Sequence, residues 1–252
     1  MSSQPLVVVC TPTYNRGFSI EFSAMCMRKQ TYQNIHWIVV DNSDDETKTW
    51  EGIQTANHGR PLTYIRETER KPIGALRNIC LEEALKLNPT YIAFWDDDDY
   101  YVPQRIAKSI EALEKDASYD IVGCEILPVF LSRENVLMET GPYGKNHSTA
   151  ATYVFRASIS QKRRFEATAW KAEEGAFTRD WTLPMIMLPN KDVILVIGHA
   201  HNTVSKSQML ENPSKFAARI TNDANAKNIV KFQWMRGDSE LWDCFRRTFL
   251  LA

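Results

Sequence analysis

The chain of 252 residues and 29.0 kDa is long enough for one α/β domain of generous size, or for one domain with a small appendage. Its 30 lysines and arginines balance 31 aspartates and glutamates, which gives a net charge of -1. The overall charge therefore gives no reason to expect a nucleic acid or an anionic membrane as a partner. Any acidic ligand must be met by a local site.

Cysteine spacing and hydropathy indicate the compartment. The cysteines form no Cys-x-x-Cys pair, which is typical of reduced thiols in a cytoplasmic protein. The N-terminus lacks the pattern of a signal peptide, and no apolar run reaches the roughly 20 residues that a membrane span needs. We therefore expect a soluble, cytoplasmic protein without an integral membrane segment. The five cysteines are Cys10, Cys26, Cys80, Cys124 and Cys244.

Apolar runs alternate with helix-like segments over the first hundred residues. Short runs rich in Val and Ile suit parallel strands covered on both faces, and their alternation with helices predicts a doubly wound sheet. In such sheets, ligands bind beyond the carboxyl ends of the strands. The expected strands cover residues 6–10, 35–40, 62–65 and 91–95, and the expected helices lie near 18–29 and 74–87.

Unusual polar residues follow three of these strands. Thr11 opens the segment Thr-Pro-Thr-Tyr-Asn-Arg after the first strand, and Asp41 opens Asp-Asn-Ser-Asp-Asp after the second. Asp96 begins a run of four aspartates after the fourth strand. Because these strand ends meet at one edge of a sheet, we expect all three to line one crevice.

The second half of the chain has a different pattern. A strand is expected at 121–124, followed by a β-hairpin or ribbon at 127–138 and a long functional loop at 141–149. A further apolar run, 193–197, precedes two histidines. From residue 213 onward the chain is rich in aromatic residues, and we expect it to be helical and to pack back on the body.

The four aspartates, 96–99, crowd like charges at the end of an apolar strand, so a cation should neutralise them. Mg²⁺ or Mn²⁺ is the natural candidate, because hard cations take carboxylate oxygens and bridge to phosphates. Alternate residues of an extended segment point the same way, so Asp96 and Asp98 are expected to face one ligand. The alternative is an acidic turn that caps the following helix.

Four segments, taken in order, carry a resemblance to a known family. They are PTYNR from Pro12, QTYQNIHWIVVDNSDD from Gln30, IGALRN from Ile73 and YIAFWDDDDYYVPQR from Tyr91. Together they resemble glycosyltransferase family 2, whose members have the GT-A fold, and the match fades after Arg105.

The resemblance implies a fold and a domain plan. The fold would be a single doubly wound, mostly parallel sheet flanked by helices, with a helical C-terminal extension. The GT-A domain would cover residues 1–205, with a nucleotide-binding half to about residue 100 and a catalytic half from 101 to 205. The extension would cover residues 206–252 and pack on the same domain.

The implied activity is metal-assisted inverting transfer of a sugar from a nucleoside-diphosphate donor, preferably a UDP-sugar. The acceptor would be a hydroxyl of a glycan, a glycolipid or a protein-linked glycan, and no nucleic acid would take part. Two other readings stay open. A GT-A module could bind the nucleotide sugar without catalysis, and a nucleotidyltransferase shares the α/β layout but would need a glycine-rich, basic loop after its first strand.

The resemblance also implies roles for individual residues. Asp41 would accept a hydrogen bond from the base, and Arg77 would approach the base or the diphosphate; the alternatives are a helix cap and an exposed ion pair. Asp98 would be the direct metal ligand, with Asp96 as a second candidate, while Asp96 or Asp97 would reach the ribose. The other nucleotide-binding residues would be Thr11, Pro12, Thr13, Tyr14 and Arg16.

An inverting transfer needs a general base that takes the proton of the attacking hydroxyl. The family carries a Glu-Asp pair at the start of a helix, with an aromatic residue three positions further on. Glu173 and Glu174, followed by Phe177, fit this spacing with Glu in place of Asp. Glu174 is the expected base and Glu173 the second choice. The alternative is an acidic pair that complements a helix dipole.

Two histidines follow the apolar run at 193–197. Imidazole is a good metal ligand beside carboxylates, and His199 and His201 would face the same way on an extended segment. Some GT-A proteins close the metal site with a histidine in a context similar to His-x-x-Asn-Thr, which favours His199. The alternative is a polar strand end without metal.

Overall fold

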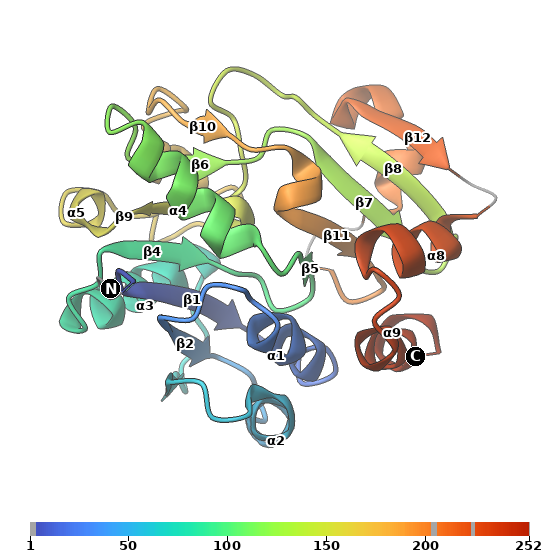
Figure 1. Ribbon diagram of the computed structural model, residues 1–252, viewed down its shortest axis with the longest axis horizontal. Coiled ribbons are helices and arrows are strands. Elements are labelled where there is room, and N and C mark those ends of the chain that lie inside the picture. The colour runs from blue at the N-terminus through green and yellow to red at the C-terminus, as the bar shows by residue number, and fades with distance from the viewer. Residues whose placement is uncertain (1–3, 203–205, 223–224, 252) are drawn as a thin grey trace.

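Residues 4–202, 206–222 and 225–251 are described by a computed structural model, in which two mixed β-sheets are surrounded by helices (Figure 1). The larger sheet has seven strands in the order β10-β6-β9-β4-β1-β2-β3. Its strands β4, β1, β2 and β3 are parallel neighbours, whereas β9 is antiparallel to both β4 and β6. The strands are β1 (Val7–Thr13), β2 (Ile35–Asp41), β3 (Leu62–Arg66), β4 (Tyr91–Phe94), β6 (Ile121–Gly123), β9 (Val154–Arg156) and β10 (Ile186–Met187).

The smaller sheet has five strands in the order β12-β8-β7-β11-β5. The expected hairpin is confirmed as the antiparallel pair β7–β8, and β11 joins it in parallel through β7. The strands are β5 (Tyr100–Tyr101), β7 (Leu127–Leu131), β8 (Val136–Thr140), β11 (Ile194–Gly198) and β12 (Ala218–Asn222).

The expectation of a single, mostly parallel sheet is therefore wrong. β11 pairs with the hairpin instead of extending the larger sheet, and β9 lies between β4 and β6 and reverses the direction of the pairing. Apolar runs show that a segment is a buried strand, but they do not show which neighbour it hydrogen-bonds to. This pairing is decided by the loops between the strands.

Helices cover both faces of the larger sheet because successive side chains of its strands point to opposite sides. Val7 and Val9 of β1 share a core with helices α1, α2 and α4, whereas Val8 and Cys10 share a second core with α3. The helices of this region are α1 (Ile20–Arg28), α2 (Thr47–Asn57), α3 (Ile73–Lys86) and α4 (Arg105–Lys115). This two-sided core holds the carboxyl ends of β1 and β4 at one edge of the sheet.

Short helices make up most of the remainder. Along the chain between β8 and β11 lie η1 (Ala150–Thr152), α5 (Ala157–Ser160), α6 (Glu174–Thr178) and η2 (Asn190–Asp192). The C-terminal part contains α7 (Gln208–Glu211), η3 (Pro213–Phe216), α8 (Ala226–Ile229), η4 (Val230–Trp234), α9 (Ser239–Phe245) and η5 (Arg246–Leu250).

The C-terminal segment is not wholly helical, which corrects the expectation for this part. Its strand β12 pairs antiparallel with β8, so it completes the smaller sheet. The expected packing against the body is present, since the rings of Phe22 in α1 and Phe245 in α9 lie 5.7 Å apart. The division into domains at residue 205 stays a prediction.

The segment before α6, residues 161–173, is fixed closely against α3. The side-chain amide of Asn78 donates to the Phe165 carbonyl (3.0 Å), and its oxygen accepts from the Phe165 amide (2.9 Å). At Gly74 the approach is so close that a Cβ atom would stand 1.9 Å from the Glu166 carbonyl oxygen. Only glycine fits at this position.

We expect Gly74→Ala to lower the free energy of unfolding by about 1–3 kcal/mol, because the added methyl group must displace backbone. Urea denaturation measures this loss. Gly144→Ala is the matched control, since a Cβ there meets no heavy atom of the described chain within 4 Å. Equal free energies of unfolding for the two variants would show that segment 161–173 can move away from residue 74 without loss of stability.

Candidate active site

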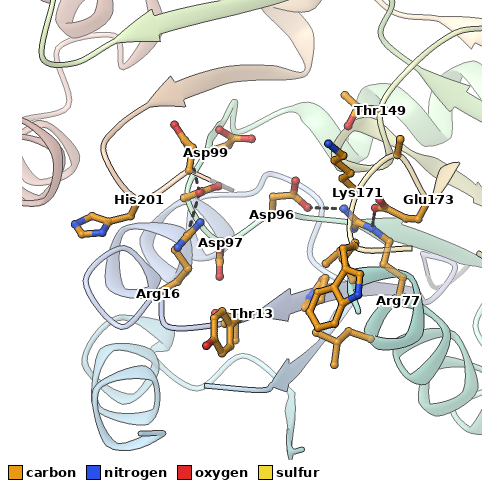
Figure 2. A pocket seen from close by; sticks show the side chains of 18 of the residues that line it. Thr13, Arg16, Arg77, Asp96, Asp97, Asp99, Thr149, Lys171, Glu173 and His201 are labelled. Carbon is orange, nitrogen blue, oxygen red and sulfur yellow. Dashed lines mark hydrogen bonds and ion pairs between the residues drawn. The ribbon is translucent and has the colours of Figure 1, made fainter. Parts of the chain in front are cut away.

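A cavity of about 550 Å³ opens at the carboxyl ends of β1 and β4, where the sequence predicted a crevice (Figure 2). Its walls come from the β1 and β4 ends, the start of α3, segment 161–173 and the chain after β11. The lining residues are Pro12, Thr13, Tyr14, Arg16, Arg70, Ile73, Leu76, Arg77, Asp96, Asp97, Asp98, Asp99, Thr149, Trp170, Lys171, Ala172, Glu173, Glu174, Val196, His201, Asn202 and Lys206.

Arg77 lies at the back of this cavity with only 4% of its side chain exposed. Its Nε donates to Glu173 Oε1 (2.6 Å) and its Nη2 to Asp96 Oδ1 (3.1 Å), as Figure 2 shows. Burial disfavours the guanidinium charge, but the carboxylates of Asp96, Glu173 and Glu174 outweigh it and raise the pKa of Arg77 above its ordinary value. Arg77 therefore forms a buried ion pair with two carboxylates instead of an exposed one.

Glu173 and Glu174 stand in different surroundings although they are adjacent. Glu173 is buried and paired with Arg77. Glu174 begins α6, and its Oε1 accepts a hydrogen bond from the Ala150 amide (3.1 Å). Burial first, and then the charge of Glu173, raise the pKa of Glu174 above its ordinary value. A carboxylate with a raised pKa accepts a proton more readily, which suits a general base.

All four aspartates of the run 96–99 line the cavity, but they are not equivalent. Burial and the neighbouring Asp98 charge raise the pKa of both Asp97 and Asp99 well above the ordinary value. Asp99 Oδ1 also accepts from the Ile197 amide (2.9 Å), which ties this turn to β11. The raised pKa values of Asp97 and Asp99 favour their neutral forms, which lowers the repulsion within the run.

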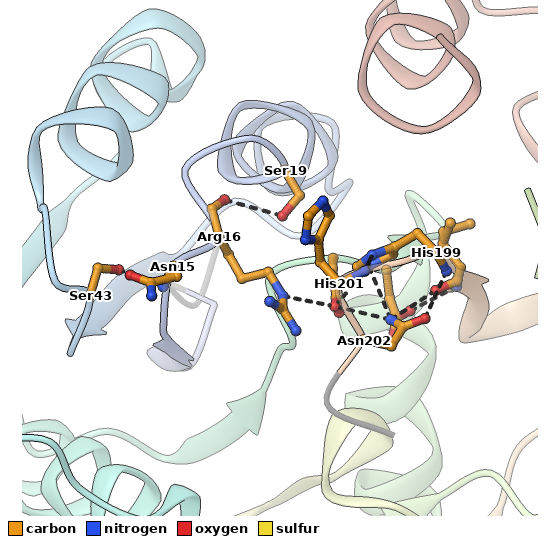
Figure 3. A network of polar contacts seen from close by, with 10 residues as sticks. Asn15, Arg16, Ser19, Ser43, His199, His201 and Asn202 are labelled. Carbon is orange, nitrogen blue, oxygen red and sulfur yellow. Dashed lines mark hydrogen bonds and ion pairs between the residues drawn. The ribbon is translucent and has the colours of Figure 1, made fainter. Parts of the chain in front are cut away.

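Asp98 is the aspartate that cationic and polar side chains surround. Its Oδ2 lies 3.0 Å from His199 Nε2, and it accepts from Arg16 Nε (3.3 Å) and Asn202 Nδ2 (3.3 Å). Figure 3 shows Arg16 approaching this point from one side, and His199 and Asn202 from the other. Burial opposes ionisation, but the hydrogen bond from His199 and the charges nearby hold the pKa of Asp98 below its ordinary value.

The two histidines also have different surroundings. His199 is packed between the rings of Phe18 (5.4 Å) and Phe249 (5.5 Å), which fixes its imidazole toward Asp98. His201 lines the cavity and lies against Phe18 (5.0 Å). His199 thus contacts the aspartate run from behind the residues that line the cavity, whereas His201 is one of the lining residues.

The side chains of Asp98 and His199 fit a divalent cation of the Mn²⁺ or Mg²⁺ type. They place one carboxylate oxygen and one imidazole nitrogen side by side, and both are donors that Mn²⁺ accepts. Within residues 4–202, 206–222 and 225–251, no three His, Cys, Asp or Glu side chains form a complete set of ligands. The remaining positions would therefore be filled by phosphate oxygens and water, as is usual for such ions at phosphate sites.

Two residues of the expected base pocket do not line the cavity. Asp41 is fully buried, with Oδ1 accepting from the Ser43 amide (2.8 Å) and Oδ2 from the Tyr64 hydroxyl (2.6 Å). Thr11 is also buried, and its hydroxyl accepts from Trp37 Nε1 (2.9 Å). In this conformation both stabilise the surrounding structure, and their contact with a base stays a prediction.

Sequence reasoning missed a group of residues at the edge of the cavity. The Arg70 guanidinium carbon lies 3.5 Å from the Tyr14 ring centre and 4.8 Å from that of Trp170. Lys171 and Thr149 also line the cavity, and Figure 2 shows them on the side where Glu173 lies. Trp170 and Lys171 directly precede the acidic pair, and Asn202 belongs to the His-x-x-Asn-Thr context, so these three had a local signal. Arg70 and Thr149 had none.

Comparison with known proteins identifies the family of this chain. A model of the family described as "Glycosyl transferase family 2" matches residues 8–170, well over half of the chain. The chain belongs to this family. Among the helices that the structure describes, none combines the length and apolar character that crossing a bilayer requires.

Curated family 2 relatives match part of their own length only. A putative glycosyltransferase of Bacillus subtilis, EpsE, is 31% identical over 128 residues, which are 50% of this chain and 45% of that protein. A UDP-Glc:alpha-D-GlcNAc-diphosphoundecaprenol beta-1,3-glucosyltransferase of Escherichia coli, WfaP, is 32% identical over 109 residues, or 43% and 41% of the two chains. The match thus spans less than half of each of these relatives.

Solved structures show the same fold. The mannosyltransferase PcManGT of Pyrobaculum calidifontis, in complex with GDP-Man and Mn²⁺, has a TM-score of 0.60 at 18% identity, over 80% of this chain and 59% of that one. Residues 1–349 of S. aureus TarS, in complex with UDP-GlcNAc, have a TM-score of 0.58 at 17% identity, over 96% and 81% of the two chains. These matches identify the GT-A glycosyltransferase fold.

We expect Arg77→Met to lower the free energy of unfolding by about 3–5 kcal/mol, because it leaves Glu173 and Asp96 without their cation. Urea denaturation at several pH values measures this. The loss should shrink on acidification: burial raises the pKa of Asp96, and without Arg77 the protonation of this carboxylate at lower pH removes an uncompensated charge and restores stability. Arg219→Met is the control, because its ion pair with Glu139 is 64% exposed on the arginine side and should contribute at most about 1 kcal/mol. A pH-independent loss would contradict this account.

Proposed function

We propose that the protein is an inverting, nucleotide-sugar-dependent glycosyltransferase. The observation that carries the proposal is one cavity with an aspartate run on one wall and the Glu173–Glu174 pair on another, joined by Arg77. This arrangement provides a place for a diphosphate beside a separate candidate base, which an inverting transfer requires. Membership in family 2 and the GT-A fold support it.

The donor is a nucleoside-diphosphate sugar, with a UDP-sugar preferred. Pro12, Thr13, Tyr14 and Arg16 line the nucleotide side of the cavity, and TarS, which shares the fold, has been solved with UDP-GlcNAc. Arg16 and Arg77 supply fixed positive charge near the diphosphate. Mn²⁺ or Mg²⁺, held by Asp98 with His199, would neutralise negative charge on the leaving diphosphate.

In the transfer, Glu174 takes the proton of the acceptor hydroxyl as its oxygen bonds to the anomeric carbon. The bond between this carbon and the diphosphate oxygen breaks, and its electron pair leaves with the diphosphate. The Ala150 amide orients the Glu174 carboxylate, and the ion pair with Arg77 fixes the position of Glu173 beside it. The acceptor is a hydroxyl of a glycan, a glycolipid or a protein-linked glycan.

Nucleotide binding should depend on the metal through Asp98. We expect calorimetry to show UDP binding with Mn²⁺ that weakens strongly in chelator, and Asp98→Asn to abolish the difference. His199→Ala should weaken Mn²⁺-supported binding more than the matched control His201→Ala, because the His199 imidazole lies 3.0 Å from Asp98 whereas the His201 ring lies against Phe18. Equal UDP binding with Mn²⁺ and with chelator would refute the metal assignment.

Loss of the base should reduce turnover without weakening donor binding. We expect Glu174→Gln to lower transfer by about 10² to 10⁴-fold, and to change the nucleotide dissociation constant by less than about threefold. Steady-state kinetics and calorimetry with UDP measure the two effects. A donor screen for slow hydrolysis of nucleotide sugars identifies the substrate first.

Glu173→Gln is the control for this experiment. Removing the Glu173 charge should lower the pKa of Glu174, so the acidic limb of the pH–rate profile should move to lower pH. An inactive Glu173→Gln beside an active Glu174→Gln would exchange the two roles. Full activity in both would leave Asp180 as the next candidate, and UDP-sugar binding without turnover would identify a binding module.

A further inference from the structure

A cluster of cationic and aromatic side chains lies outside the cavity, on the C-terminal segment. Lys231 Nζ stands 5.2 Å from the ring centre of Phe232 and 5.7 Å from that of Trp242. Phe232 is 61% exposed, which is unusual for a side chain of this size and polarity. We name the C-terminal patch by its members Lys227, Lys231, Phe232, Trp242 and Arg246.

Helices α8 and α9 carry this patch side by side near the C-terminal end of the molecule (Figure 1). Lys227 and Lys231 are four residues apart along α8 and η4, so they point to the same side. Trp242 and Arg246 have the same spacing along α9 and η5. The ring of Trp242 also stacks on that of Phe245 (5.5 Å), which fixes it to the core.

The charge of this segment is locally positive although the whole chain is nearly neutral. Residues 225–251 contain five cations, Lys227, Lys231, Arg236, Arg246 and Arg247, and three acids, Asp238, Glu240 and Asp243. Two of the acids are already engaged: Asp238 pairs with Lys29 (2.6 Å), and Glu240 with Arg28 (2.5 Å) and Lys29 (3.2 Å).

The third acid compensates the patch only weakly. Asp243 lies 3.6 Å from Arg246, with both side chains more than half exposed, and such pairs contribute little in water. Arg247 pairs with Glu21 (3.5 Å) and is not counted in the patch. The patch therefore presents net positive charge around an exposed aromatic ring.

We propose that the C-terminal patch docks the protein on the surface of a lipid bilayer that contains anionic lipids. Such a surface attracts clustered lysines and arginines through its headgroup charge, and it accepts aromatic rings at the boundary between headgroups and acyl chains. Lysine suits this place because its alkyl stem contacts the apolar layer while its ammonium stays at the phosphates. Phe232 enters the boundary, and Lys227 and Lys231 bind the headgroups.

The patch shares no residue with the cavity, so this proposal does not rest on the proposed transfer reaction. The patch is a local region of positive charge on a chain whose overall charge is close to neutral. Docking through one side of the molecule requires no membrane span.

Co-sedimentation with vesicles tests the proposal without donor or acceptor. The probes are vesicles of pure phosphatidylcholine, and vesicles in which phosphatidylglycerol replaces about a third of it. We expect binding to the anionic vesicles only, and its loss in about 1 M NaCl, where the Debye length is about 3 Å.

Variants show whether this surface is responsible. The double reversal Lys227→Glu with Lys231→Glu should weaken partition into anionic vesicles by at least about 25-fold, because each cation near the surface contributes about fivefold. Phe232→Ser should weaken it about fivefold and leave the salt dependence unchanged. Lys108→Glu with Lys115→Glu is the matched control: it makes the same charge change on exposed positions of α4 and should change partition by less than about twofold.

Three results would overturn the proposal. One is equal binding to both kinds of vesicle or binding that persists in high salt, and a second is an equal effect of the two double reversals. The third is a dimer in light scattering that Phe232→Ser dissociates, without vesicle binding, which would make the patch an interface between copies. Circular dichroism of each variant ensures that a folded protein is compared.

Discussion

The buried ion pairs of Arg77 are the interaction on which the site depends. One guanidinium from α3 holds Asp96, at the end of β4, and Glu173, just before α6, which stands 96 residues further along the chain than Arg77. The guanidinium carbon of Arg77 lies 5.0 Å from the ring centre of Phe94 and 5.9 Å from that of Phe165, so packing against these rings also fixes its orientation. Burying a guanidinium is costly, and two carboxylates offset this cost only while all three side chains keep their places. The donor side and the base side of the cavity are thereby held in one geometry.

The charged side chains that line the cavity are close to balance. Six carboxylates line it, at 96–99, Glu173 and Glu174, against five cations, which are Arg16, Arg70, Arg77, Lys171 and Lys206. A bound diphosphate adds further negative charge. Burial and the charge of Asp98 raise the pKa values of Asp97 and Asp99, so ionisation of these two carboxyls is disfavoured. A divalent ion at Asp98 and His199 would restore the balance, which gives the aspartate run a physical reason beyond the family resemblance.

The sequence predicted the motifs and their meeting place better than the architecture around them. The aspartate run and the acidic pair line one cavity. Both could be located from the sequence, because the end of a parallel strand and the start of a helix are local features of the residue order. The partners of Asp41 could not be predicted in this way, since Tyr64 approaches it from a neighbouring strand and Ser43 through a turn. The position of Arg70 between Tyr14 and Trp170 likewise joins three segments, and its register depends on loops that no periodicity describes. The same cause hid the second sheet: β11 and β12 pair with the hairpin β7–β8, and this pairing is set by the tertiary structure.

The C-terminal segment has a part in the site that its distance along the chain conceals. Phe249 of η5 packs on His199 from one side and Phe18 from the other, so the imidazole that meets Asp98 is held by a ring from the last helical turn. The same segment continues through the stacked rings of Phe245 and Trp242 to the C-terminal patch. A close-packed chain of aromatic rings resists independent movement of its members. The orientation of His199 therefore depends on how the C-terminal segment packs against the rest of the protein.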